Sequence, residues 1–430
     1  MRLEIESIDI KDIQAASKTY AKDGVLFVNV KELEELILKD PRIQSVKISL
    51  VYPGDKVRIL NLLDVVQPRC KIDGKNADFP GVVGKMQTAG QGRTRSLRGV
   101  AVLVSNPCSN RKENGVLDMA GPIGEMSPYG KMKNVSISPY SVPGTGDHDF
   151  EDAVKAAGLK TAVYLAQGAE GLPVQEMEVY DLDIPNLDKK SNLPRVALYY
   201  QVYSPQFDFQ AISDPCMYGT DVRYMLPIIL HPNEVLDGGV VGWHVVKAID
   251  TYSIQNHGIV KEMYRHHGKD LNFVGVVCAT ANMEQEARSR SAYMAVNLLK
   301  NVLGADGVVL MKIVGGMPHI DLAFTGELCE AAGVRTAIST QPLTPFGTLA
   351  DTILFNAECL DLIITTSATF EKTKIAFQAE KFIGGDAQTV IFCPEPIVQR
   401  ASDPEVTIEE YMLPGVLDCT GNVKIIVKEY

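Results

Sequence analysis

Between residues 195 and 370, short apolar runs alternate with helical patterns, and this alternation constrains the fold more than any other feature of the chain. Four of the runs are apolar along most of their length, as in strands that are buried on both faces. They are RVALYYQV, NFVGVVCA, GVVLMKI and LDLIITTS. In one helical pattern between them, Met294, Leu298 and Val302 recur every four residues, beside Ala295 and Leu299. The sequence therefore predicts a mostly parallel, doubly wound α/β sheet with helices on both faces.

The rest of the chain has a different texture, which is β-rich at the N-terminus. LEIESIDI alternates with a period of two, as in a half-buried strand, and VKELEELILKDP places Leu33 and Ile37 on one helical face. A second helical pattern starts at Asp147, and Gly158 suits its C-terminal end. We expect four regions, which are a β-rich N-terminal domain (1–105), a loop-rich segment with an α/β extension (106–190), a Rossmann-like α/β domain (195–370) and a C-terminal α/β extension (371–430).

The composition argues against nucleic acid or membrane as a partner. The formal net charge is −11, whereas phosphate binding needs a dense cluster of Lys and Arg. No apolar run approaches the roughly 18 residues of a membrane span, and MRLEIESIDIKD lacks the apolar centre of a signal peptide. The eight cysteines contain no CxxC pair, which is typical of reduced thiols rather than zinc or iron–sulfur ligands. We therefore expect a cytoplasmic protein.

In open parallel sheets, ligands bind at the carboxyl ends of strands, near a reversal of strand order. The loops of interest follow residues 202, 240, 279, 313, 340 and 367. Gly315-Gly316 matches neither a dinucleotide motif nor a P-loop, so it is interpreted as a tight turn. His319 and Asp321 form an HxD pair, which either binds a metal or places Asp321 as the cap of the next helix. The sequence leaves both readings open.

The segment 231–257 concentrates unusual residues, including three of the seven histidines and the only tryptophan. A histidine beside carboxylates can act as a general acid or base near neutral pH, although a hydrogen-bonded loop histidine is the simpler alternative. The residues that we expect to be catalytic are His244, Asp237, His257 and Glu234. Those that we expect to bind substrate are Gly239, Trp243, Gln255 and Asn256.

Many short motifs occur in a fixed order along the chain. They are MRLE, PGDKVRI, DVVQPR, FPG, GQGRT, DMAGP, His148-Asp149, AGLKTAVYL, YGTDVRYMLP, HPNEVLDGGVV and QNHGIVKEMYRHHGKDLNFVGV. Together they resemble the large subunit of component B of glycine, sarcosine and betaine reductases, with the D-proline reductase proprotein as a relative. The resemblance implies a cytoplasmic subunit that pairs with a second subunit carrying a selenocysteine or cysteine nucleophile, in a complex that cleaves a C–N bond of a small amine or betaine reductively.

Members of this family form a pyruvoyl group by chain cleavage before a cysteine that follows Asn or Thr in a Gly-rich stretch. The segment 236–256 stands in that place, and its best-aligned positions read Gly242, Trp243, His244 and Val245. Valine has neither a hydroxyl nor a thiol, so the acyl shift that starts the cleavage cannot occur there. Hydroxyl and thiol residues nearby, such as Thr251, lie out of register. We therefore expect no pyruvoyl group and predict no other cofactor, while the metal content is not readable.

Two hypotheses follow for the function. In the preferred one, the chain is a pyruvoyl-free enzyme subunit of a hetero- or homo-oligomer, and the partner's thiol or selenol attacks a small substrate near His244 and Asp237. In the alternative, the chain is a non-catalytic scaffold or regulatory homologue that stabilises its partner. The acid–base residues retained in 231–257 favour the first, and the loss of the family's cysteine favours the second.

Overall fold

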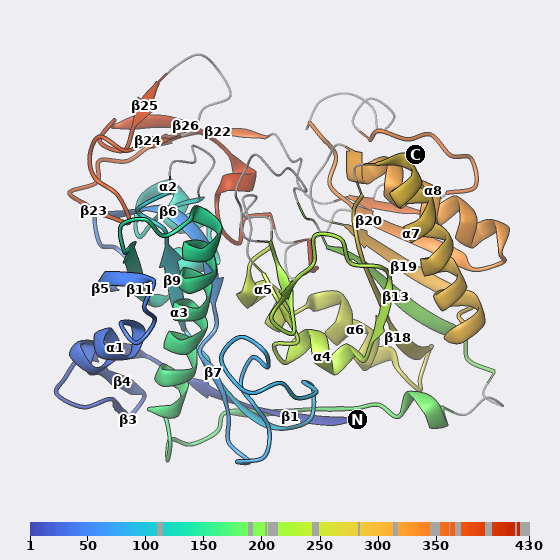
Figure 1. Cartoon of the computed structure of the whole chain (residues 1–430), viewed down its shortest axis with the longest axis horizontal. Coiled ribbons are helices and arrows are strands. Elements are labelled where there is room, and N and C mark those ends of the chain that lie inside the picture. The colour runs from blue at the N-terminus through green and yellow to red at the C-terminus, as the bar shows by residue number, and fades with distance from the viewer. Residues whose placement is uncertain are drawn as a thin grey trace.

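A computed structural model describes most of the chain, and it confirms a mixed α/β fold. The described residues are 1–109, 115–187, 192–202, 204, 214–242, 249–282, 284–312, 317–344, 353–360, 362–365, 371–391, 398–417 and 419–421. Figure 1 shows the N-terminal sheets with α3 on the left and the parallel sheet with α7 and α8 on the right, with α5 between them. The limits of the four expected regions stay a prediction.

The N-terminal half contains two large sheets. The first has the order β12-β1-β8-β7, and the second has the order β10-β6-β9-β11-β5. Their strands are β1 (Arg2–Asp9), β5 (Ile43–Val51), β6 (Val57–Val66), β7 (Arg69–Lys71), β8 (Gly92–Arg98), β9 (Val100–Ser105), β10 (Gly115–Asp118), β11 (Lys133–Ser141) and β12 (Glu176–Asp181). A small sheet, β2 (Asp12–Ala15), β4 (Val25–Val28) and β3 (Tyr20–Lys22), lies beside them in that order.

The helices of this half are α1 (Val30–Ile37), α2 (Gly121–Met126) and α3 (Asp147–Gln167), with short turns η1 (Pro128–Lys131) and η2 (Ile184–Asn186). Helix α1 buries Leu33 and Ile37 as predicted. The expected end of α3 at Gly158 is wrong, because the helix continues for nine further residues to Gln167. Gly158 serves close packing instead, since a Cβ there would lie 2.6 Å from a methyl group of Val104.

The α/β half is built on a six-stranded sheet of order β16-β18-β13-β19-β20-β21, in which only β16 runs antiparallel to its neighbour. The strands are β13 (Arg195–Val202), β16 (Ile228–Leu230), β18 (Asn272–Thr280), β19 (Gly307–Lys312), β20 (Arg335–Thr340) and β21 (Ile363–Thr365). Apart from the short β16, the next strand of this sheet along the chain after β13 is β18, which lies on one side of β13. The strand after that, β19, lies on the other side of β13. The strand order therefore reverses between β13 and β19.

Several helices belong to the same half of the chain. They are α4 (Pro232–Leu236), α5 (Thr251–Gln255), α6 (Gly258–His266), α7 (Gln285–Asn297), the π-turn η4 (Leu298–Val302) and α8 (Met317–Ala331). Alternate residues of β13 belong to different cores: Tyr200 packs in the cluster that includes Met263 of α6, and Tyr199 packs in the cluster that includes Ala295 of α7 and Leu322 of α8.

Only part of the predicted apolar pattern of α7 faces the core. Met294 and Val302 are exposed, whereas Ala295 and Leu299 are buried. The helix ends at Asn297 and passes into the π-turn η4, so the spacing of four does not continue along one face. The core face is therefore carried by the neighbouring small and leucine residues.

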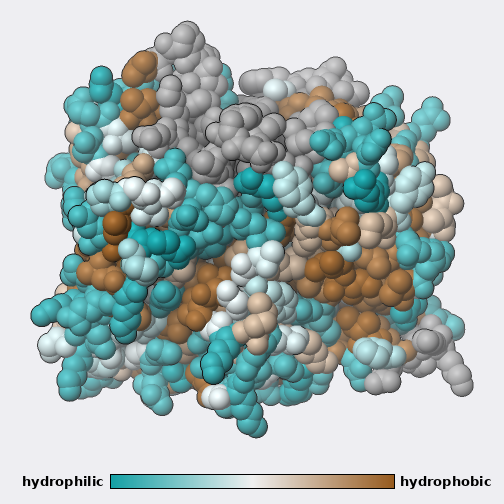
Figure 2. Space-filling view, viewed as in Figure 1, coloured by the Kyte–Doolittle hydropathy of each residue, from teal (hydrophilic) through white to brown (hydrophobic). Residues whose placement is uncertain are grey.

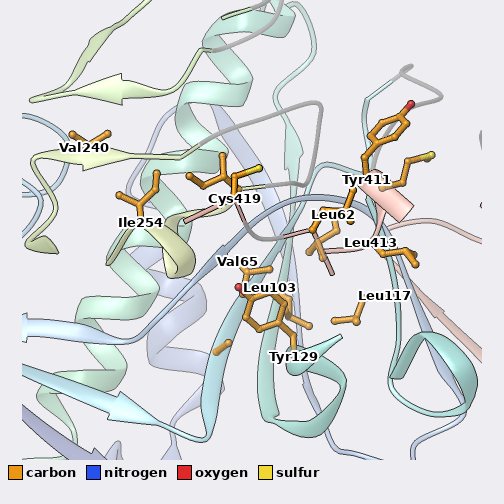
Figure 3. Close-up of a cluster of buried hydrophobic side chains, with 14 of the residues drawn as sticks. Leu62, Val65, Leu103, Leu117, Tyr129, Val240, Ile254, Tyr411, Leu413 and Cys419 are labelled. Atoms are coloured by element: carbon orange, nitrogen blue, oxygen red, sulfur yellow. The ribbon is translucent and has the colours of Figure 1, made fainter. Parts of the chain in front are cut away.

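The C-terminal segment returns to the N-terminal half. Its elements are β22 (Lys372–Ala376), β23 (Lys381–Ile383), β24 (Val390–Ile391), β25 (Gln399–Arg400), β26 (Glu405–Glu409) and η5 (Glu410–Met412), and a separate small sheet joins β14 (Cys216–Met217), β15 (Thr220–Asp221) and β17 (Val240–Val241). Strand β23 pairs with β6 in parallel. Figure 3 shows Tyr411, Leu413 and Cys419 beside Leu62 and Ile254, so one hydrophobic core joins the two halves.

Candidate functional site

The start of the predicted segment is a helix cap. His231 precedes α4, and its Nδ1 accepts the backbone N–H of Asn233 at 3.1 Å, while its Nε2 donates to the Leu182 carbonyl at 3.0 Å. Glu234 accepts the backbone N–H of His231 at 2.6 Å and the hydroxyl of Tyr218. These contacts form a capping box, so both oxygens of Glu234 are engaged in local structure. Gly239 continues this structure, because its N–H donates to the Glu234 carbonyl at 2.9 Å.

Asp237 lies in a buried ion pair at the end of α4. Its carboxylate pairs with Lys71 and accepts the Thr94 hydroxyl at 2.8 Å and the Gly90 N–H at 2.9 Å. A buried pair of this kind is stable only when further hydrogen bonds satisfy its lone pairs, which these two donors do. The neighbouring Asp78 accepts a hydrogen bond from the backbone N–H of Lys71 at 2.6 Å. Burial raises the pKa of Asp78 to about 6. The described surroundings of Asp237 therefore include a carboxyl group that titrates near neutrality.

Residues that follow the segment 243–248 are fixed by the N-terminal half. The two carboxylate oxygens of Asp64 accept the N–H of Thr251 at 2.9 Å and its hydroxyl at 2.6 Å. The Thr251 hydroxyl oxygen is also 3.3 Å from the carbonyl oxygen of Gly242. Asp250 caps α5 and accepts the hydroxyl of Tyr129 at 2.8 Å. Trp243 and His244 lie outside the described residues.

A buried arginine holds the predicted substrate-binding residues Gln255 and Asn256. Arg69 donates to the Gln255 carbonyl at 2.9 Å, to the Asn256 side chain at 3.1 Å and to the Leu236 carbonyl at 2.8 Å. Gln67 accepts from both Arg69 and the Asn256 amide at 2.7 and 2.8 Å. Gln67 and Arg69 belong to the motif DVVQPR, which contributed to the family resemblance. The sequence did not reveal that these two residues contact Gln255 and Asn256.

His257 is a neutral, buried histidine at the start of α6. Its Nδ1 accepts the Val260 N–H at 3.4 Å, and its ring stands edge-on to Tyr200 at 5.4 Å between centroids. Burial lowers the pKa of His257 to about 3. A neutral ring that accepts at Nδ1 carries its proton on Nε2, and that atom has no partner in the described part of the chain. His257 can thus donate a hydrogen bond, but it does not exchange protons near neutral pH.

The carboxyl edge of the parallel sheet brings together a second group of buried polar side chains. Gln201 and Lys312 end the two strands between which the strand order reverses, and they lie opposite each other in register. Gln201 donates to Asp321 at 3.0 Å, but its own carbonyl oxygen has no partner among the described residues. Lys312 is fully buried, its Nζ makes no hydrogen bond within the described structure, and burial lowers the pKa of its amine well below the usual value.

The HxD pair contributes to the same edge. His319 Nε2 donates to the Gln341 carbonyl at 2.8 Å, and its Nδ1 accepts the Leu354 N–H at 3.4 Å, so both ring nitrogens are engaged. Burial lowers the pKa of His319 to about 3. Asp321 accepts the Asn282 N–H at 3.1 Å, and burial raises the pKa of Asp321 to about 6. No group of three His, Cys, Asp or Glu side chains with metal-binding geometry occurs among the described residues.

Unpartnered polar atoms mark this edge as a candidate ligand site. Besides Lys312 and Gln201, the hydroxyl of Thr340 and both amide atoms of the Gln341 side chain are buried without a described partner. Each such atom costs about 1–3 kcal/mol, and native proteins keep few of them. The strand-end rule predicted the loops after 202, 313 and 340, but it named no side chain there. The one available signal was the lysine that interrupts the apolar run GVVLMKI.

A separate cleft lies beside α6, and Lys312, Gln201, Thr340 and Gln341 are not among its lining residues. It has a volume of about 580 Å³. It is lined by residues that include Gly258, Val309, Ser339, Ile364 and Gly421. This volume is within the range of small-molecule sites.

Two motifs of the family resemblance meet at another place in the fold. His148, at the start of α3, lies 3.0 Å from a carboxylate oxygen of Asp221 in the motif YGTDVRYMLP. They line a cleft of about 590 Å³ together with Met217, Tyr224 and Met225. Burial raises the pKa of Asp221. The structure thus gives these separate motifs a common location away from the segment 231–257.

The fold and the carboxyl-edge site define an α/β protein with a candidate small-molecule site, and comparison with known proteins gives the family. Residues 1–390 match the family of glycine/sarcosine/betaine reductase component B subunits. The glycine reductase complex component B subunits alpha and beta of Acetoanaerobium sticklandii are 34% identical over 345 residues, which are 79% of each chain. The sarcosine reductase complex component B subunit alpha of Peptoclostridium acidaminophilum is 35% identical over 79% of each chain.

The betaine reductase complex component B subunit alpha of Peptoclostridium acidaminophilum is 30% identical over 80% of this chain and 79% of its own. This chain therefore belongs to the component B family, and the resemblance predicted from its motifs is confirmed. No solved structure matches it. The described helices include none that is long and apolar enough to cross a membrane. The roles expected for His244, Asp237, His257 and Glu234 stay predictions.

Proposed function

We propose that this chain is a subunit of a component-B-type reductase complex that cleaves a C–N or similar bond of a small substrate reductively. A partner subunit supplies the Cys or Sec nucleophile. The observation that carries the proposal is the family match over residues 1–390, together with relatives that are components of glycine, sarcosine and betaine reductase complexes. We extend this to a cytoplasmic hetero- or homo-oligomer, with a doubly wound α/β region and no nucleic-acid or membrane partner.

The partner needs a surface on which to bind, and exposed apolar side chains offer one kind of support. Tyr293 and Val302 on α7 and η4, and Tyr224 and Leu226 before β16, are all more than half exposed. In the view of Figure 2, hydrophobic residues gather near the centre of the face and over the α/β half, within a mostly hydrophilic surround. Exposed apolar patches of this kind are typical of interaction sites.

In the proposed mechanism the chain has no pyruvoyl group of its own. The sequence from Gly242 to Ala248 contains no Cys, Ser or Thr. The Thr251 hydroxyl donates to Asp64, and the peptide carbonyl before Thr251 accepts the Ile254 N–H at 3.1 Å in an ordinary first helical turn. Cys216 is buried, and burial raises the pKa of its thiol. These residues do not fit a self-cleaving site, so no step passes through a pyruvoyl group.

The chain's own residues can bind and orient a substrate for attack by the partner. The neutral His257 offers a buried N–H donor, and Asp78, with a pKa of about 6, can give or take a proton near neutral pH. The proposed acid–base residue is His244, because the residues Asp250 and Thr251 that follow its segment are held by Tyr129 and Asp64. Asp237 would act with Lys71, the cation to which it is paired.

A scaffold function is the second candidate, and one observation favours it. Glu234, Asp237, Gln255 and Asn256 are all held in hydrogen bonds that stabilise helix ends or join the two halves. Side chains used in this way do not need a substrate to explain them. In this reading, the chain would stabilise the partner without contributing a group to the reaction.

Reconstitution of the complex tests both candidates. The chain is combined with its Cys- or Sec-bearing partner, and turnover of glycine, sarcosine and betaine is measured beside complex formation by size-exclusion chromatography. We expect His244→Ala to abolish turnover while the complex still forms. His266→Ala is the matched control, because this histidine is exposed and bonded only to Asp270 and Glu262. Unchanged turnover in His244→Ala would remove His244 from the mechanism, and partner activity that does not depend on this chain's variants would favour the scaffold.

A further inference from the structure

Lys312 differs from the other buried lysines of the described structure in having no partner. Lys155 donates to the Asp214 carbonyl at 2.7 Å and to Asp152 at 3.4 Å, and Lys71 is paired with Asp237. The Nζ of Lys312 is equally buried, and within the described residues no oxygen or nitrogen accepts from it. A buried ammonium group without an anion is strongly disfavoured, whereas a neutral amine needs none.

The groups that face Lys312 do not supply a negative charge. His319 is neutral because both of its ring nitrogens are hydrogen-bonded, one as donor and one as acceptor. Asp321 on α8 accepts hydrogen bonds from Gln201 and from the Asn282 N–H. Among the described residues, Cys419 favours the charged amine, but burial outweighs it, so the pKa of Lys312 falls well below its usual value. A deprotonated lysine amine is a nucleophile.

The position in the fold is the one in which parallel sheets bind ligands. Lys312 ends β19 beside β13, where the strand order reverses, and Thr340 ends the neighbouring strand β20. Gln341 lies beside His319, because its backbone carbonyl accepts a hydrogen bond from the His319 ring. Its amide and the Thr340 hydroxyl are buried and unpartnered within the described structure. The Gln341 amide N–H groups and the Thr340 hydroxyl can donate hydrogen bonds to a carboxylate.

We propose that Lys312 is the nucleophile of a carbonyl-binding site for a small 2-oxo acid. Its Nζ bonds to the carbonyl carbon, and the Gln341 amide and the Thr340 hydroxyl donate to the carboxylate. The lone pair of Nζ attacks the carbonyl carbon, and both protons of the amine leave with the carbonyl oxygen as water, which yields an imine. The step consumes no oxidant and no reductant.

This activity goes beyond the proposed reductase function, because it belongs to this chain alone and requires no partner. The test therefore uses the isolated full-length chain. Its failure would leave the reductase proposal standing, and failure of the reconstituted reductase would leave this proposal standing.

The experiment traps the imine by reduction. The chain is incubated at pH 7 with pyruvate and sodium cyanoborohydride, and the adduct is located by denatured mass and peptide mapping. We expect a single adduct on Lys312, in at least ~10-fold excess over exposed Lys374, because ordinary lysines are almost entirely protonated at this pH. Lys155 is the matched internal control, since it is as buried as Lys312 but paired.

Lys312→Met should remove the adduct and keep the fold, because methionine has a similar length and buries no amine. The wild-type peptide map decides the question even if this variant does not fold. Absence of an adduct on Lys312, or labelling no greater than that of Lys374, would overturn the proposal. Labelling of Lys155 to the same extent would overturn it as well, because burial alone would then explain the reaction.

Discussion

Because of His257, the free energy of unfolding should fall by about 2 kcal/mol between pH 7 and pH 5. Replacing His257 by asparagine should abolish this part of the pH dependence. The pKa of His257 is about 3 in the folded protein and near 6.5 in an unfolded chain. Between these values the unfolded state binds more protons, so the free energy of unfolding falls as the pH falls through this window. The pH dependence amounts to about 1.4 kcal/mol per unit, and pH 5 lies about 1.5 units below the unfolded pKa.

The assay is guanidinium unfolding followed by circular dichroism at pH 7 and pH 5. Asparagine at position 257 does not titrate, and it remains a good N-cap for α6, so its oxygen can accept the Val260 N–H in place of Nδ1. His266→Asn is the control, because Asp270 and Glu262 raise the pKa of that exposed histidine and its contribution has the opposite sign. Equal pH dependence in wild type and His257→Asn would refute the reasoning, since His257 would then accept a proton in the folded state.

Two further substitutions test the packing around the candidate site. Gly242→Ala should destabilise the protein by about 1–3 kcal/mol, because the new Cβ would lie 2.9 Å from the Thr251 nitrogen. The melting temperature measures this effect. An unchanged melting temperature would mean that the backbone shifts at no energetic cost. Asp237→Asn should lower the free energy of chemical unfolding by about 3–5 kcal/mol, because it leaves the buried Lys71 charge without its counter-ion. The control Glu262→Gln, at an exposed ion pair, should change stability little. Equal effects of the two variants would argue that the Asp237 pair is hydrated.

Local pattern was sufficient for several elements of the α/β half, but it missed strand β11 in the region expected to be loop-rich and misplaced some element limits. The apolar runs predicted β13, β18, β19 and β21, because strands buried on both faces must be apolar on both sides. Gly158 was misplaced as a helix end, because glycine also serves where Val104 approaches closely. The spacing of four through Met294 did not by itself identify the buried face, because a π-turn follows the helix at Leu298.

The sequence alone determined the family, the α/β class and the valine at position 245, where a cysteine would be needed for cleavage. The tertiary structure alone decided which polar residues have partners. Gln67 bonds Gln255 across 188 positions, and no periodicity encodes such a contact. It also decided that Lys312 is buried without a hydrogen-bond partner among the described residues. Periodicity reports which face of an element avoids water, whereas the charge of a side chain depends on every group that surrounds it after folding.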